Sequence, residues 1–215
     1  MTDLSNKTKS DLRYVLEYCG DADLKNRAGT QLISQQATNE DLRYVLRWCG
    51  DADLKNRALT QLISQQATNE DLRYVLRWCG DADLKNRALT QLISQQATNE
   101  DLAHAICFAP GTIPVAHPLL LKQLGIDVPV DEVALIKEIA ENVLARPGSL
   151  EMASWHCGTS HCMSGWACVL NKTAENIERS SSTFIAGAAV IPNYAQHFFK
   201  SNNEALEIFK TVLAL

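Results

Sequence analysis

The chain has 215 residues, 46% hydrophobic and 21% charged, which is typical of a soluble globular protein with one large or two small domains. Its formal net charge is −5. This charge argues against nucleic acid as the main partner, because a phosphate backbone requires a concentrated basic surface. No apolar stretch is long enough to span a membrane, and residues 1–10 are too polar for a secretory signal. Seven cysteines, an odd number, lead us to expect a reducing cytoplasm.

A segment of 30 residues occurs twice without a single difference, over residues 38–67 and again over residues 68–97. An imperfect copy over residues 8–37 precedes them. A partial copy over residues 98–108 begins with TNEDL and then diverges. A period near 30 residues is typical of arrays in which small units stack on one another.

Each repeat divides into two segments with apolar residues at helical spacing. TNED before the first segment predicts a capping box between Thr38 and Asp41, and Gly50 is expected to end that helix in a left-handed conformation. Asp51 or Asp53 is expected to cap the second helix. The connections are short, so the two helices of a repeat are expected to be antiparallel neighbours. The expected inward residues are Leu42, Val45, Leu46, Cys49, Leu54, Ala58, Leu59, Leu62 and Ile63.

A two-helix unit cannot cover its own apolar face, and stacking of such units makes a continuous core. The sequence therefore predicts an all-α fold, with an α-solenoid over residues 8–108 and a compact C-terminal helical domain over residues 109–215 that caps it. Residues 8–102 resemble HEAT-like and leucine-rich-repeat-variant arrays of paired helices. That resemblance implies the architecture and no particular activity, because such arrays bind many unlike partners.

Arginine and aromatic residues stand beside the apolar face of each first helix. In stacked repeats they would form a ridge, and these residue types are enriched at protein-binding hot spots. Alternatively, the rings pack between adjacent repeats and the arginines pair with Glu40, Asp41 or Asp51. Base stacking on the rings is a remoter option, because the charge of each repeat is balanced. The candidate binding residues are Arg43, Tyr44, Arg47, Trp48, Arg73, Tyr74, Arg77 and Trp78, and the first repeat has Arg13, Tyr14, Glu17 and Tyr18 at these positions.

After the repeats, prolines and glycines divide the chain into shorter elements. We expect a helix over 100–108, a short helix followed by a turn over 125–129, and a longer helix from about 130 to 145. Two more are expected, over 183–191 and from residue 201 or 202 onward. No strand pattern is evident.

The segment from Trp155 to Cys168, WHCGTSHCMSGWAC, is the part of the chain with most chemical potential. It is open to three interpretations. In the first interpretation, the segment binds a metal ion through its histidines and cysteines, which are residue types that bind zinc. The candidate metal ligands are His156, Cys157, His161 and Cys162.

In the second interpretation, Thr159 or Ser160 caps a helix and places Cys162 in its first turn, where the dipole favours a thiolate. His161 or His197 would then act with Cys162 in a thiol hydrolase. In the third, the segment is structural, and one face of the helix is buried in the core. That face would consist of Cys162, Gly165, Trp166 and Val169.

The segments SLEMASWHCGTSHCMSGWACVL and AGAAVIPNYAQHFFKSNNEALEIFK resemble a set of small bacterial and phage proteins. Those proteins carry a W-H-x-C-x-T-x-H-C-x-A-G-W segment, an alanine-rich helix and an HFF-x-S-N-x-x-A ending. The resemblance covers about residues 133–213. It departs at the missing spacer between His156 and Cys157 and at Ser164, which replaces the usual alanine. It implies a domain and no established activity.

From these observations we expect a non-catalytic scaffold that binds a protein or peptide through the repeats and needs no cofactor. A copied repeat suits a surface of adjustable length, whereas an active site gains nothing from it. The alternatives are a cysteine-dependent enzyme and a small structural metal site. The oligomeric state is left open.

Overall fold

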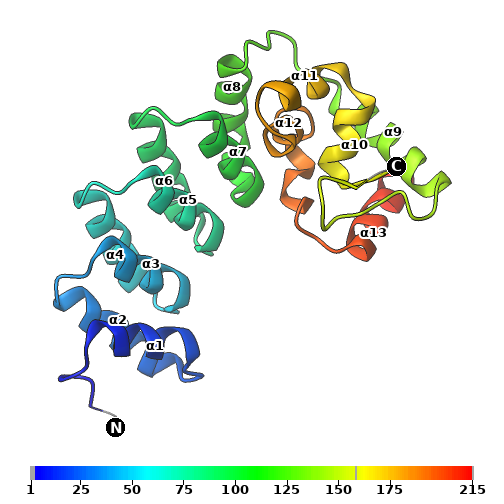
Figure 1. Cartoon of the computed structure of the whole chain (residues 1–215). Coiled ribbons are helices and arrows are strands. Elements are labelled where there is room, and N and C mark those ends of the chain that lie inside the picture. The colour runs from blue at the N-terminus through cyan, green and yellow to red at the C-terminus, as the bar shows by residue number, and fades with distance from the viewer. Residues whose placement is uncertain (1–2, 158, 215) are drawn as a thin grey trace. The chain divides into compact units, whose positions relative to one another are not determined.

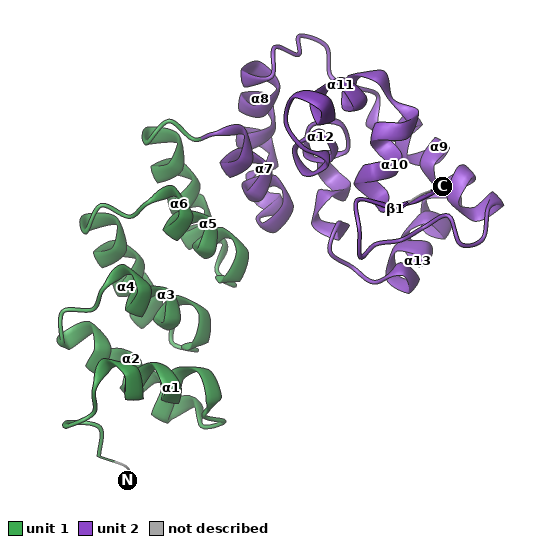
Figure 2. Cartoon of the chain, viewed as in Figure 1, with its two compact units in different colours: residues 1–97 green, residues 98–215 purple. Residues whose placement is uncertain are grey.

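The computed structural model describes residues 3–157 and 159–214 (Figure 1). The all-α prediction is confirmed, since within these ranges the only strands are the two-residue β1 (His156–Cys157) and β2 (Ser160–His161). The chain forms two compact units, residues 1–97 and 98–215, each with its own set of packed helices (Figure 2). Every helix in the described ranges is too short or too polar to cross a lipid bilayer.

Unit 1 is a stack of helix pairs, as the repeat period predicts. The two helices of each repeat pack against one another, and the first helices of successive repeats also pack together. In the repeat over residues 38–67 both apolar faces are buried, apart from Ile63, which is half-buried. Burial raises the pKa of the Cys49 thiol to about 12, so this cysteine is a packing residue. The helices are α1 (Lys9–Tyr18), α2 (Ala22–Ser34), α3 (Asn39–Trp48), α4 (Ala52–Ser64), α5 (Asn69–Trp78) and α6 (Ala82–Ser94).

The predicted capping box begins every first helix. In α3 the Thr38 hydroxyl accepts from the Asp41 N–H at 3.3 Å, and the Asp41 carboxylate accepts from the Thr38 N–H at 2.9 Å. Asp51 caps the second helix by accepting from the Leu54 N–H at 2.7 Å. These caps satisfy backbone donors that have no partner inside the helix.

The left-handed residue of each repeat lies elsewhere than predicted. The helix α3 ends because Cys49 is extended, and Gly50 does not have a positive φ. Instead Gln66, after α4, has a φ of 59°. The Ala67 N–H donates to the Leu62 carbonyl at 3.2 Å and the Gln66 N–H to the Ile63 carbonyl, which is a Schellman motif. The prediction for Gly50 was therefore wrong, since an extended residue ends the first helix and needs no glycine.

Unit 2 begins with α7 (Asn99–Phe108), the partial fourth repeat that the sequence analysis grouped with residues 8–97. Ala103 and Cys107 replace two arginines of the repeat and are buried, and α7 packs on α8, α12 and η2. The other elements are η1 (Pro110–Thr112), α8 (Ile113–Gln123), α9 (Glu132–Ala145), α10 (Met163–Leu170), α11 (Lys172–Ser180), α12 (Thr183–Val190), η2 (Pro192–His197) and α13 (Asn202–Leu213).

The short hairpin β1–β2 occupies residues where the thiol interpretation placed the start of a helix. The His161 N–H donates to the Ser149 carbonyl and the Glu151 N–H to the His161 carbonyl, so the hairpin also pairs with the chain that precedes it. The hairpin lies on α10, where Gly165 leaves room for it: a Cβ there would be 2.1 Å from the Trp155 carbonyl oxygen. Because of the hairpin, α10 begins only after Cys162.

Candidate functional site

The first of the two ridge arginines in a repeat links that repeat to the next one. The Arg43 guanidinium of α3 lies 3.4 Å from the Asp71 carboxylate and 3.7 Å from that of Glu70, both at the start of α5. It also lies 5.5 Å from the centre of the Tyr74 ring, within cation–π range. Arg13 makes the same set of contacts one repeat earlier. For these residues the structure matches the packing interpretation, with acidic partners in the following repeat.

The second arginine of the ridge has a different environment. The Arg47 guanidinium is 4.5 Å from the centre of the Trp48 ring and 4.0 Å from that of Trp78. It donates to the Tyr74 hydroxyl at 3.5 Å. In the described part of the chain no carboxylate lies within ion-pair distance of it. The two indole rings therefore fix a half-buried cation whose charge is not neutralised.

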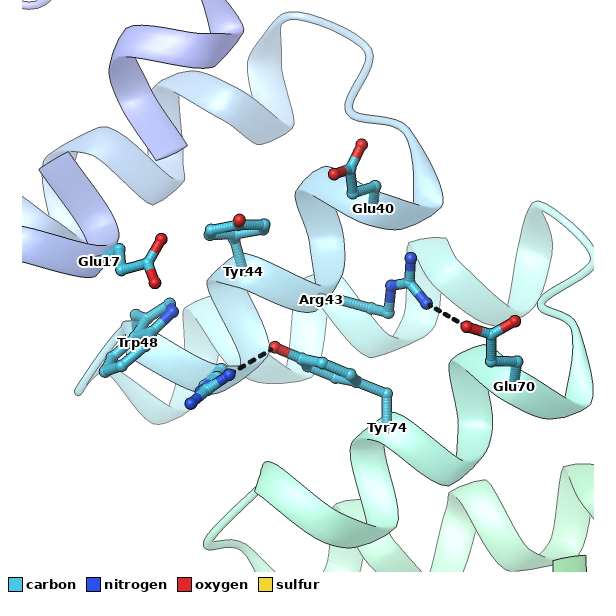
Figure 3. Close-up of a pocket in the computed structure, with 8 residues that line it drawn as sticks. Glu17, Glu40, Arg43, Tyr44, Trp48, Glu70 and Tyr74 are labelled. Carbon is cyan, nitrogen blue, oxygen red and sulfur yellow. Dashed lines mark hydrogen bonds and ion pairs between the residues drawn. The ribbon is translucent and has the colours of Figure 1, made fainter. Parts of the chain in front are cut away.

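A cavity of about 320 Å³ opens on this surface, between the first helices of the three repeats (Figure 3). In Figure 3 the Glu17 carboxylate lies beside Trp48 and Tyr44, while Arg43 and Glu70 lie on the other side of the view. Among the described residues Glu17 has no hydrogen-bond or ion-pair partner. The lining residues, which we call the groove, are Glu17, Glu40, Arg43, Tyr44, Arg47, Trp48, Glu70 and Tyr74.

Five of the eight predicted binding residues line the groove. The other three are Arg73, Arg77 and Trp78. Trp78 does not line the groove but contacts Arg47 and is 40% exposed, and the Arg77 guanidinium lies 4.9 Å from its ring centre. Arg73 is half-buried. The structure thus brings together the central part of the predicted ridge.

In unit 2 the two histidines of the hairpin form a hydrogen-bonded cluster with Glu178 of α11. The Nδ1 atoms of His156 and His161 are 2.7 Å apart, and His156 Nε2 is 2.8 Å from a Glu178 carboxylate oxygen. The Thr183 hydroxyl donates to the same oxygen. Only one proton fits between the two Nδ1 atoms, so one imidazole donates and the other accepts.

The cluster shifts the acidity of its members. Burial, and then the neighbouring His156, lower the pKa of His161. Burial alone would raise the pKa of Glu178, but hydrogen bonds from Thr183 and His156 outweigh it and lower that pKa. The cluster therefore favours an ionised Glu178 beside a neutral His161.

Cys162, the candidate nucleophile, is the N-cap residue of α10 and lies in the core. Its thiol is 1% exposed, its sulfur accepts from the Gly165 N–H at 3.3 Å, and burial raises its pKa. No hydrogen bond joins it to a histidine within the described ranges. His197 lies in η2 against Tyr194, and burial lowers its pKa. The structure does not bring these three candidates together as a hydrogen-bonded set.

The four metal candidates are also separated by their exposure. His156 and Cys157 are both exposed on β1, His161 is half-buried and Cys162 is buried. In residues 3–157 and 159–214 no three His, Cys, Asp or Glu side chains are placed to hold a metal ion together. On this face of the hairpin the side chains connect β1 to α11.

These sites also contain acidic residues that were not among the candidates, including Glu17 and Glu178. Glu17 carried a signal, because it is the acidic residue at a position where the next two repeats have arginine. Glu178 carried none, because it lies 22 residues from His156 and only the fold joins them. No protein-family model, no curated protein and no solved structure matches the chain.

Proposed function

We propose that the chain is a non-catalytic binding module that holds a peptide segment of a partner protein in the groove of unit 1. The observation that carries the proposal is Arg47, a half-buried guanidinium fixed between Trp48 and Trp78 with no carboxylate partner among the residues that the structure describes. Arg13 and Arg43, by contrast, are neutralised by acidic residues of the next repeat. A charge that the fold orders but does not neutralise is available to a ligand.

The groove has the properties of a binding hot spot. Arginine and tryptophan dominate such sites, and a side chain that is already ordered loses little entropy when the ligand binds. The walls are helices and not loops, so the positions of the lining residues are set by the packing of the repeats. The cavity is also in the size range of sites that accept a side chain or a short segment.

The test begins with a phage-displayed library of random peptides selected on the full chain. The selected peptides are synthesised, and their dissociation constants are measured by isothermal titration calorimetry. Replacing Trp48 with alanine removes a wall of the groove and should weaken binding by about 2 kcal/mol or more, roughly 30-fold. Arg47→Ala should weaken it similarly.

The matched control is Trp155→Ala, which truncates an exposed tryptophan in unit 2. This variant should bind the same peptides with unchanged affinity. Circular dichroism of all variants checks that the helices are retained. If every selected peptide binds Trp48→Ala as tightly as it binds the unmodified chain, the groove is not a peptide site and the proposal is wrong.

A further inference from the structure

The partial fourth repeat shows how a first helix of this type is covered. By alignment of the repeats, Ala103 and Cys107 of α7 replace the residues equivalent to Arg43 and Arg47. Both are buried, and α12 and η2 pack against α7. Where small apolar residues occupy these two positions, as in α7, other apolar elements of the chain pack on the helix.

Aromatic rings from unit 2 lie against the aromatic positions of α7. The Phe184 ring of α12 is 5.1 Å from that of His104, and the Phe199 ring is 5.3 Å from that of Phe108. His104 and Phe108 are the counterparts of Tyr44 and Trp48 in the groove. A segment that covers a first helix of this protein thus uses aromatic side chains against these two positions.

The groove differs from α7 in its charges. Glu40 pairs with Arg13 at 2.6 Å, and Glu70 lies 3.7 Å from Arg43, so these lining charges are balanced within unit 1. Glu17 and Arg47 remain, one of each sign, at the same position of successive repeats. A ligand that satisfied both would have to present a basic and an acidic group in a fixed order along the stack.

From this we infer that the groove binds a peptide segment with a defined polarity. The segment carries a basic side chain for Glu17, an acidic side chain for Arg47, and an aromatic side chain against the Tyr44 and Trp48 rings. The inference rests on the proposed peptide-binding function and adds the chemistry of the ligand. It also assigns a role to Glu17, which makes the first repeat differ from the other two.

Charge-reversed proteins and peptides test the polarity together. The phage selection is carried out on the unmodified chain, on Glu17→Arg and on Arg47→Glu. Neither substitution breaks an ion pair among the described residues, and arginine already occupies this position in the other repeats, so both variants are expected to fold. Peptides from the unmodified chain should contain one basic and one acidic residue. Reversing the basic residue should weaken binding to the unmodified chain by about tenfold or more, and Glu17→Arg should restore it.

The outcomes separate the peptide-binding function from the polarity of the bound peptide. If binding depends on Trp48 but the selected charges are the same for all three proteins, the polarity is wrong and the peptide-binding function stands. If no selected peptide depends on Trp48, both are wrong.

A second copy of the chain is the competing occupant. Concentration-dependent dimerisation in analytical ultracentrifugation, lost in Trp48→Ala, would overturn the partner-peptide inference.

Discussion

At the scale of single residues, the acidic residue three positions after each N-cap has two functions. Asp71 is 5% exposed and closes the capping box of α5 through the N–H and hydroxyl of Thr68. It also accepts from the Asn39 amide at 3.0 Å and pairs with Arg43, both on α3. One carboxylate therefore accepts from donors at the start of a helix that have no partner inside it, and it also joins two repeats.

Asp71→Ala should lower the free energy of unfolding by about 2–3 kcal/mol, because it removes the cap and leaves buried donors of two helices without an acceptor. The measurement is equilibrium unfolding in urea, followed by circular dichroism. Glu70→Ala is the matched control, since Glu70 also faces Arg43 but its side chain is 77% exposed. A loss for Glu70→Ala as large as that for Asp71→Ala would contradict this account.

The thiols of unit 2 distinguish a packed cysteine from a reactive one. Cys157 is exposed, whereas Cys162 is buried and its pKa is raised. A mild alkylating reagent near neutral pH should therefore modify Cys157 rapidly and Cys162 only after denaturation, because the thiolate is the reactive form. Peptide mass mapping identifies the modified residue, and Cys157→Ser should abolish the fast reaction there. Rapid alkylation of native Cys162 would revive the thiol-enzyme alternative.

How far the sequence predicts side-chain contacts depends on their range. The capping box at Thr38 was predicted because both partners lie within four residues. For the arginines the acidic positions of the partners were predicted, as Glu40 or Asp41. That Arg43 pairs with Glu70 and Asp71 of the next repeat was not, because this depends on the register of the stack. The same limit applies to Arg47, whose second ring, Trp78, comes from the next repeat.

At the scale of helices, the ends of the second helices are under conformational strain. Gln36, Gln66 and Gln96 all have a positive φ, and a side chain with a Cβ is disfavoured there. Each repeat therefore has a glutamine at a position where glycine is usual. The rest of the Schellman motif, including the buried Ala67, holds the conformation in place.

Gln66→Gly should raise the free energy of unfolding by about 0.5–1 kcal/mol, because glycine adopts this φ without steric strain. Gln65→Gly should have the opposite sign. Gln65 has an ordinary negative φ, and its amide donates to the Ala37 carbonyl of the preceding connection at 3.2 Å. Urea midpoints of the two variants decide the matter, and a stabilised Gln65→Gly together with a destabilised Gln66→Gly would refute it.

Helix prediction failed where a helix is mostly polar, or where pairing with a residue distant in the sequence sets the end of a helix. The helix α11 was missed because only Ala174 and Ile177 of its residues are buried, which is too few for a clear apolar stripe. The helix α10 begins later than the thiol interpretation placed it, because the pairing of His161 with Ser149 was not evident from local sequence. Val169 was expected in the core but is 51% exposed.

At the scale of the molecule, the titrating groups of unit 2 make stability depend on pH. The pKa values of His161 and His197 are lowered by burial, so below the ordinary histidine pKa the unfolded chain binds more protons than the folded one. Stability from these groups is fully present above that pH and decreases on acidification. The lowered pKa of Glu178 has the same sign at more acidic pH. Acidification therefore acts against unit 2 through both kinds of group.

Urea unfolding between about pH 7.5 and 5.5 should show a midpoint that falls as the pH falls. His161→Asn keeps a hydrogen-bonding group beside His156 and removes one titrating group, so its midpoint should change less steeply with pH. Circular dichroism and the intrinsic fluorescence of Trp155 and Trp166 follow the transition. A midpoint that rises on acidification in this range would have the wrong sign for both histidines.

The architecture itself was predictable because identical segments must form identical local structure. The all-α class and the helix pairs follow from the period of 30 and its apolar stripes. The boundary between the two units does not follow from this period, because α7 begins like a repeat. It nevertheless belongs to unit 2, through residues such as Ala103 and Cys107. Those substitutions were visible in the sequence, but the helices that cover them come from residues about 75 to 95 positions later, as for Phe184 and Phe199.

The contacts that join one repeat to the next have a consequence for how such a chain changes over generations. Arg43 with Asp71, and Gln65 with the Ala37 carbonyl, use residues that every full copy carries. A recombination event that inserts or deletes one complete copy would therefore leave every junction chemically matched. Each inserted copy would bring two more arginines, one more tyrosine and one more tryptophan to the ridge. Inheritance could in this way lengthen or shorten the recognition surface in steps of 30 residues, with no compensating mutation elsewhere.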